Sequence, residues 1–171
     1  MNNEITTIRT DEILLRKIVM TDVDDIFKGL SDSRVNKYYG VRLHTMEDAR
    51  NQMNWYESES QVWWTIYSSN GNTFYGAGGL IEINNGKAEI GLWLLPEYWG
   101  QGIMKSAMAL ITRYGFQKLS LNRIEGYVET ENVNCINAMS KLDYVREATL
   151  ENHEIKDGKS VNLELYVKSI A

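Results

Sequence analysis

The chain has 171 residues, of which 43% are hydrophobic and 11% aromatic, and its formal net charge is -5. This length suits a single domain of residues 1–171, and the apolar content allows a sizeable core, which excludes a largely disordered chain. The acidic balance disfavours nucleic acid as a partner, because neutralising phosphates requires a basic face, and it leaves room for a cationic or amine substrate.

The first half of the chain predicts one strand, two helices and an antiparallel meander of three strands. Thr21 and Thr45 are suitable N-caps for the two helices. The apolar period then changes from helical spacing to two, and turns of the Asn-Gly type separate the strands. The expected elements are a strand at 13–18, helices at 21–30 and 45–57, and strands at 62–67, 73–83 and 87–95.

The second half predicts helices and strands in alternation, closed by a hairpin whose turn is Asp157-Gly158. The expected elements are helices at 101–119 and 133–142 and strands at 123–129, 144–155 and 160–169. A meander followed by a βαβ unit and a hairpin is typical of an α/β (α+β) domain. We expect a mixed, mostly antiparallel twisted sheet of about seven strands flanked by about four helices.

Cysteine usage and the N-terminus bear on the compartment. The single cysteine, Cys135, cannot form an intrachain disulfide, and residues 1–5 lack the basic region of a secretion signal. No apolar run approaches the roughly 20 residues that a membrane-spanning helix needs. We therefore expect a cytoplasmic protein without membrane association. His44, His153 and Cys135 are not at ligand spacing, so no metal site is expected, and both histidines are interpreted as solvent-facing or structural.

The segment from Pro96 to Met104 is the first that suggests chemistry. Pro96 ends the preceding strand because it has no N–H for the ladder, and Gly100 and Gly102 fall in the turn that opens the long helix. The free N–H groups and the dipole of a helix N-terminus favour phosphate. An ordinary turn explains the same glycines. The third glycine of a dinucleotide fingerprint and the Gly-Lys-Ser/Thr end of a P-loop are absent.

A second segment runs from Asn132 to Tyr144. Asn132 suits the N-cap of a short helix. Cys135, three residues later, is then either a small apolar residue on the buried face of that helix or part of a site. The residues of this segment alone leave both interpretations open.

Together the two segments resemble the GNAT acetyltransferase superfamily, and within it the ribosomal-protein N-terminal acetyltransferase (RimJ/RimL-like) type. The most specific match is Ala88-Glu89-Ile90-Gly91-Leu92-Trp93 running into the Pro96–Gly102 segment, with Asn132-x-x-Cys135 at the right distance beyond. The resemblance implies a splayed central strand pair and acetyl-CoA as the acetyl-donor cosubstrate. The residues it implies for CoA are Leu92, Trp93 and Leu94 beside the pantetheine arm, Asn132 and Cys135 on its other side, and Trp99, Gly100, Gln101, Gly102, Ile103 and Met104 around the pyrophosphate.

The resemblance also implies direct attack of a primary amine, most closely a protein or peptide N-terminal α-amine, on the thioester. Glu154, ranked first, and Glu89 match positions where family members carry a catalytic base, although either can be a surface or cross-strand charge. Cys135 stands where the family usually has serine, and a reference thiol pKa of about 8.5 suits proton delivery to the leaving thiolate. Met139 replaces the tyrosine of the polyamine-acetylating branch, which disfavours a spermidine-type acceptor.

Two other functions fit the same residues. One is acetylation that detoxifies a small amine or antibiotic, and the other is a non-catalytic acyl-CoA-binding sensor in which Cys135 marks lost activity. Residues 31–43 are expected to shape the acceptor site, and Trp55, Trp63 and Trp64 belong either to its wall or to the core. Aromatic-rich surface strands are compatible with a homodimer.

Overall fold

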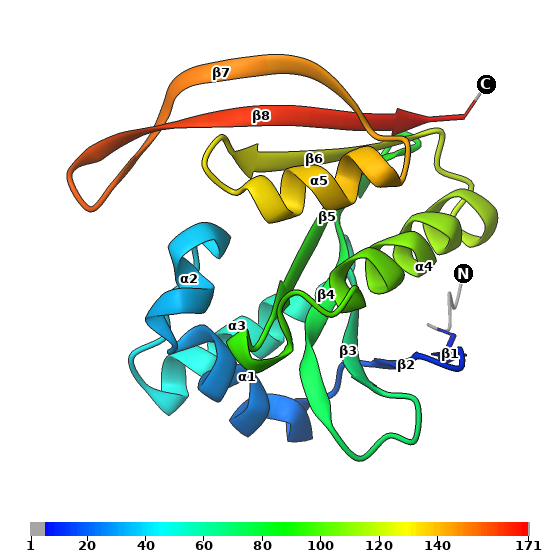
Figure 1. Ribbon diagram of the computed structural model, residues 1–171. Coiled ribbons are helices and arrows are strands. Elements are labelled where there is room, and N and C mark those ends of the chain that lie inside the picture. Colours follow the sequence, from blue (N-terminus) through cyan, green and yellow to red (C-terminus); the bar gives the residue numbers. More distant parts are fainter. Residues whose placement is uncertain (1–5, 171) are drawn as a thin grey trace.

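The computed structural model describes residues 6–170; residues 1–5, on which the expectation about a secretion signal rests, lie outside the described residues, as does residue 171. An eight-stranded sheet in the order β1-β2-β3-β4-β5-β6-β8-β7 forms the centre of the fold (Figure 1). Neighbouring strands are antiparallel except β5 and β6, which are parallel. The strands are β1 (Ile8–Arg9), β2 (Ile13–Lys17), β3 (Val62–Ser68), β4 (Phe74–Asn84), β5 (Lys87–Leu94), β6 (Arg123–Glu129), β7 (Val145–Lys156) and β8 (Lys159–Ser169).

Five α-helices and two 3-10 turns complete the described chain. They are α1 (Val23–Leu30), α2 (Ser33–Tyr39), α3 (Met46–Tyr56), α4 (Ile103–Lys118) and α5 (Val133–Lys141), with 3-10 turns at Met20–Asp22 and Pro96–Tyr98. Across residues 6–170, no helix combines the length and the apolar character that crossing a membrane requires.

The mixed, mostly antiparallel sheet confirms the predicted fold class, but the eight strands and five helices correct the expected about seven and about four. The additional strand, β1, has two residues, too few to show an alternating pattern. The additional helix, α2, begins where the Asp32 side chain accepts a hydrogen bond from the N–H of Arg34, and it ends at Gly40, whose φ is 81°. Its seven residues make about two turns, so no amphipathic period is visible in the sequence.

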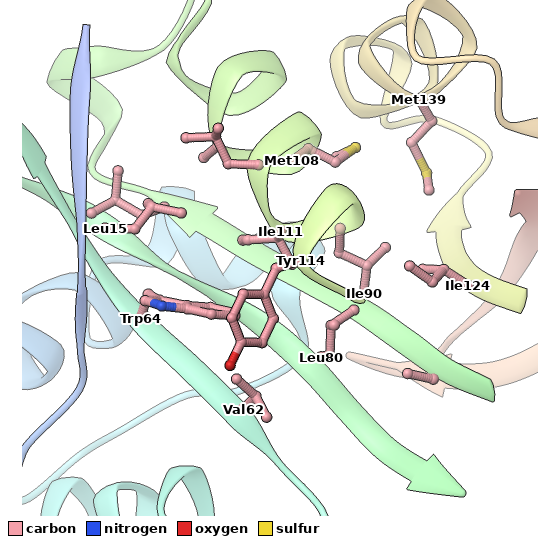
Figure 2. Close-up of a cluster of buried hydrophobic side chains, with 14 of the residues drawn as sticks. Leu15, Val62, Trp64, Leu80, Ile90, Met108, Ile111, Tyr114, Ile124 and Met139 are labelled. Carbon is pink, nitrogen blue, oxygen red and sulfur yellow. The ribbon is translucent and has the colours of Figure 1, made fainter. Parts of the chain in front are cut away.

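Helices cover both faces of the sheet, and successive residues of a strand enter two different cores. Trp64 belongs to the core beneath α4 and α5, where its ring centroid lies 4.9 Å from that of Tyr114 (Figure 2). Trp63, the preceding residue, belongs to the second core, beneath α1, α2 and α3. β5 divides in the same way, with Ile90 in the first core and Trp93 in the second. The central strand is therefore apolar because both of its faces are covered.

β5 and β6 begin as parallel neighbours and then separate. Their pairing covers Lys87–Glu89 and Arg123–Glu125, after which the strands diverge (Figure 1). Met139 of α5 fills the gap at the point of divergence, where a Cβ on Gly126 would lie 2.2 Å from the Met139 methyl carbon. The expected splay is thus confirmed, and the edge of β5 that faces β6 is free of strand pairing from residue 90 onward among the described residues.

Candidate active site

The separation of β5 from β6 opens two cavities that share a wall. The inner cavity, of about 240 Å³, extends from the strand gap toward α2 and α3. The outer groove, of about 400 Å³, extends toward the N-terminus of α4 and along α5. The residues common to both walls are Tyr38, Tyr39, Leu92, Met104, Asn132 and Cys135. A chemical group at this shared wall can act on ligands in both spaces.

The turn after β5 forms one end of the outer groove. Gly100 and Gly102 have φ values of 74° and 80°, and Gly102 is the N-cap of α4. A Cβ at either glycine would meet no atom within 4 Å, so the left-handed backbone, and not a lack of space, selects glycine. Nε1 of Trp99 donates a hydrogen bond of 2.9 Å to the carbonyl oxygen of Leu94, which ties the turn to the end of β5.

The first turn of α4 makes this end of the groove suitable for a polyanion. The first helical hydrogen bond runs from the N–H of Ser106 to the carbonyl of Gly102, so the N–H groups of residues 103–105 precede it. Their partial positive charge is reinforced by the helix dipole. Three cationic residues line the same groove: Arg34, Lys105 and Lys141. Pyrophosphate is therefore a fitting ligand for the predicted turn.

The free edge of β5 supplies backbone groups between the groove and the cavity. The N–H of Leu95 donates to the carbonyl of Tyr75 on β4 at 2.8 Å, and successive N–H groups of a strand point to opposite sides. The N–H of Trp93 therefore points toward β4, whereas those of Leu94 and Leu92 point into the gap. Of the three predicted β5 residues, Leu92 lies at the shared wall, where its N–H can meet an oxygen between the two spaces.

Asn132 and Cys135 lie on the opposite side of the gap. The Asn132 Oδ1 accepts a hydrogen bond of 3.3 Å from the N–H of Cys135, which confirms Asn132 as the N-cap of α5. The Cys135 side chain is half-buried, and burial raises the pKa of its thiol to about 11. The thiol therefore keeps its proton at neutral pH and is an S–H donor at the shared wall.

Glu89 is the carboxylate of the inner cavity. Burial raises its pKa from the ordinary glutamate range to about 7, and the neighbouring carboxylates of Glu82, Glu125 and Glu154 act in the same direction. At neutral pH this group is therefore divided between its protonated and ionised forms. A carboxylate in this state, inside a cavity, is suited to accept a proton from a substrate.

Five aromatic side chains line the inner cavity beside aliphatic ones, and a hydrogen-bonded chain fixes part of this wall. Nε1 of Trp93 donates to the Tyr56 hydroxyl at 3.2 Å, and that hydroxyl lies 3.3 Å from the hydroxyl of Tyr39. These contacts join β5, α3 and α2. The aromatic lining residues are Tyr38, Tyr39, Trp55, Trp63 and Tyr127. Residues 31–43 were expected to shape the acceptor site, and α2, within this segment, supplies part of the cavity wall.

Two of the predicted site residues lie away from both cavities. Glu154 is exposed on β7, opposite Val161 of β8, and is absent from the described walls of the two spaces. Its carboxylate adds to the negative charge around Glu89. Gln101 is also exposed, and its Nε2 donates to the carbonyl of Glu97 at 3.1 Å, so its side chain braces the turn.

Lys156 is a residue near the site that the sequence did not reveal. Its Nζ donates to the carbonyl of Lys37 on α2 and, at 2.7 Å, to the Glu129 carboxylate on β6. The β7–β8 hairpin is thereby attached to α2. The two partners are 119 and 27 residues away in sequence, so no local motif marks this lysine.

Comparisons with known proteins agree with this geometry. The model of the acetyltransferase (GNAT) domain matches residues 12–145. An uncharacterized N-acetyltransferase, p20, of Bacillus licheniformis is 30% identical over 167 residues, which cover 94% of this chain and 94% of that protein.

Two solved structures share the fold. A spermidine N-acetyltransferase of Vibrio cholerae, in complex with CoA and spermine, superposes with a TM-score of 0.86 at 19% identity, over 94% of this chain and 96% of that one. A ribosomal-protein-S5-alanine acetyltransferase of Vibrio fischeri gives a TM-score of 0.85 at 18% identity, over 96% of each chain. With the domain match and the residues of the groove, the chain belongs to the GNAT acetyltransferase family and is an acetyl-CoA-dependent N-acetyltransferase.

Proposed function

We propose that this enzyme acetylates the α-amine of a peptide or protein N-terminus. The observation that carries the proposal is the position and protonation of Glu89. It lies in a cavity that meets the outer groove at Leu92 and Cys135, and its pKa is about 7. The resemblance of the sequence to the RimJ/RimL-like type supports the same acceptor. The fold itself does not choose, because a ribosomal-protein-S5-alanine acetyltransferase and a spermidine N-acetyltransferase share it equally.

Proton affinities favour an α-amine over a lysine or a polyamine. An α-ammonium has a reference pKa of about 7.7–8.0, and a lysine ammonium of about 10.4. A base with a pKa of about 7 accepts a proton from the α-ammonium at a cost of about 1 kcal/mol, against about 5 kcal/mol from a lysine ammonium. The proton affinity of Glu89 is therefore better matched to that of an α-amine than to that of a lysine amine.

Glu89 of the inner cavity and the residues of the shared wall divide the reaction between them. Acetyl-CoA lies in the outer groove, with pyrophosphate at residues 100–105 and the thioester beside Leu92. Glu89 takes one proton from the acceptor ammonium, and the neutral nitrogen forms a bond to the thioester carbonyl carbon. The N–H of Leu92 stabilises the oxyanion. The C–S bond then breaks, and the leaving thiolate takes the proton released by the nitrogen as the amide forms.

Cys135 serves this step as a hydrogen-bond donor. With a pKa of about 11, its thiol is a weaker acid than an ordinary thiol of about 8.5, so complete proton transfer to the CoA thiolate is unfavourable. An S–H bond directed at the sulfur still stabilises the negative charge that develops there. This role replaces the proton delivery that the reference pKa alone suggested.

A panel of acceptors tests the proposal. Ala- and Ser-initiated peptides, the same peptides blocked at the N-terminus but carrying an internal lysine, and spermidine are each incubated with the enzyme and acetyl-CoA at pH 7.5. We expect thiol release with the free N-termini, at a kcat/KM at least ~10²-fold above that for spermidine, given the difference in proton affinity. Preferred turnover of spermidine or of the internal lysine contradicts the proposal. Turnover of small amines alone supports a detoxifying enzyme, and CoA binding without any turnover supports a sensor.

Replacing Cys135 by serine is expected to preserve activity. The serine hydroxyl is a stronger donor than a thiol, and the N-cap bond from residue 135 uses its backbone, so kcat should stay within about threefold of wild type. Cys135→Ala removes the donor and should lower kcat by about tenfold. Steady-state kinetics with unchanged thermal melting check both. A Cys135→Ser enzyme as impaired as Cys135→Ala would contradict the donor role.

A further inference from the structure

A lysine side chain crosses the far end of the gap between β5 and β6. Glu129 is the last residue of β6, where this strand has diverged from β5. Nζ of Lys156, the last residue of β7, donates to the Glu129 carboxylate at 2.7 Å and to the carbonyl oxygen of Lys37 on α2. The turn that follows β7 extends past the end of β6 toward α2 (Figure 1). Three elements that are distant in sequence thus meet at one ammonium group.

The end of α2 is a suitable partner for an ammonium group. Lys37 lies in the last turn of this helix, where the final carbonyl groups have no partner within the helix. The helix dipole adds partial negative charge at the same end. The Lys156 side chain is 24% exposed and that of Glu129 is 12% exposed, so water screens this pair less than it screens a surface pair. The contact therefore satisfies all three groups that take part in it.

The other polar contacts of α2 lead away from β6. Nδ2 of Asn36 donates to the carbonyl of Leu30 on α1 at 3.2 Å, and the hydroxyl of Tyr39 lies 3.3 Å from that of Tyr56 on α3. Among the hydrogen bonds and ion pairs of residues 6–170, the contact of Lys156 is the one that joins α2 to the strands beyond the gap. The distance between α2 and β6 therefore depends on this lysine.

The two elements that Lys156 joins are both walls of the inner cavity. α2 contributes Tyr38 and Tyr39, and β6 contributes Tyr127 and Val128. Lys156 itself is not part of the described wall of either cavity. Any effect of this lysine on a ligand in the cavity must therefore act through the separation of α2 from β6.

We propose that Lys156 is a positioning residue, which fixes the distance between α2 and β6 and thereby limits the size of the first side chain of the acceptor. This inference rests on the proposed function, because it places the first residue of the acceptor in the inner cavity with Glu89. The cavity, of about 240 Å³, has to hold the amine and the first side chain together. A wall that cannot move outward excludes large side chains, and a pocket of fixed size discriminates between acceptors that differ by methylene groups.

The first test measures size discrimination with Ala- and Phe-initiated peptides that are otherwise identical. Lys156→Met removes the ammonium group and keeps an unbranched side chain. It should lower the ratio of kcat/KM for the Ala peptide to that for the Phe peptide by about tenfold. Lys156→Arg keeps the charge and the donors, so the ratio should stay within about threefold of wild type. Lys159→Met, which removes an exposed lysine from the same hairpin, should leave the ratio unchanged.

Two results of this test overturn the inference. One is an unchanged ratio in Lys156→Met, and the other is an equal fall of the ratio in Lys159→Met. Because Lys156→Met leaves the largely buried Glu129 carboxylate without its partner, the fold itself can lose stability. The double variant Lys156→Met/Glu129→Gln removes both charges and should show the same loss of discrimination with a higher melting temperature than Lys156→Met. Wild-type discrimination in the double variant would assign the effect to the unpaired carboxylate and also overturn the inference.

Hydrogen exchange tests the contact without turnover. With CoA bound, the backbone amides of residues 34–40 should exchange faster in Lys156→Met than in the wild type or in Lys159→Met, because α2 has lost its contact with β6. Equal exchange in the three proteins overturns the inference. Faster exchange in an enzyme whose wild type acetylates no peptide N-terminus supports the positioning of α2 by Lys156 and refutes the proposed function, so the two failures are distinguishable.

Discussion

Replacing Glu89 by glutamine is expected to lower kcat/KM for an Ala-initiated peptide by about 10²–10⁴-fold at pH 7.5, because a positioned base contributes a factor of this size. The substitution preserves side-chain size and removes the carboxylate. Acetyl-CoA affinity should change little, since Glu89 lines the inner cavity and is not part of the described wall of the outer groove. Steady-state kinetics and a CoA binding isotherm separate the two effects.

The pH dependence of kcat/KM tests the role of Glu89 most specifically. Wild-type kcat/KM requires ionised Glu89, with a pKa of about 7, and an acceptor that arrives as the ammonium. On a logarithmic plot the rate should therefore rise with a slope of one up to about pH 7 and fall above about pH 8, where the α-ammonium is lost. In Glu89→Gln the amine must arrive neutral, so the rate should rise up to about pH 8 and then level off without a fall. A rise that ends near pH 7 and a fall above pH 8 that both persist in the variant would assign the base to another group.

Glu154→Gln is the matched control, because Glu154 is the other candidate base and stands exposed on β7. Its charge contributes to the raised pKa of Glu89. Its removal should therefore lower that pKa slightly and leave kcat/KM at pH 8 within about twofold of wild type. Loss of activity in Glu154→Gln, with near-normal activity in Glu89→Gln, would make Glu154 the base instead.

Replacing Gly102 by valine is expected to weaken CoA binding by about 10²-fold. At φ of 80° a β-branched residue is strained, and relief of that strain moves the N–H groups at the start of α4. Hydrogen bonds to a charged group contribute about 1.5–3 kcal/mol each, so misplacing one or two of them gives a loss of this order. Isothermal titration with CoA measures it.

Gly158→Val is the matched control for this prediction. Gly158 has φ of 76° in the turn between β7 and β8, and a Cβ there would meet no atom within 4 Å, as at Gly102. Both variants should lose similar thermal stability, and the Gly102 variant alone should lose CoA affinity. Equal affinities in the two variants would show that the turn does not bind the pyrophosphate.

The sequence predicted the features that depend on neighbouring residues. Two examples are the glycine turn at Gly100 and Gly102 and the Asn132 cap. Both follow from local backbone chemistry, and the structure has both. α2 was not predicted, because its seven residues are too few to show the apolar spacing of a helix.

The choice among candidate site residues could not be made in this way. Glu89 and Glu154 are both glutamates in predicted strands. What separates them is burial, which arises from the β5–β6 gap and the helices above it. Trp63 and Trp64 show the same limit. The sequence left both as either core or cavity wall, and only the packing of α3 against β3 and β5 shows which of them lies on the side of the cavity.

Catalysis by Glu89 requires the acceptor amine to reach this carboxylate in the inner cavity, beside the wall shared with the outer groove. A crystal structure of the enzyme with CoA and an Ala-initiated peptide tests this requirement, because the pair cannot react. We expect the pyrophosphate on residues 100–105 and the sulfur beside Cys135. The peptide nitrogen should lie at Glu89, directly or through one water. A peptide nitrogen bound at Glu154, outside the inner cavity, would contradict it.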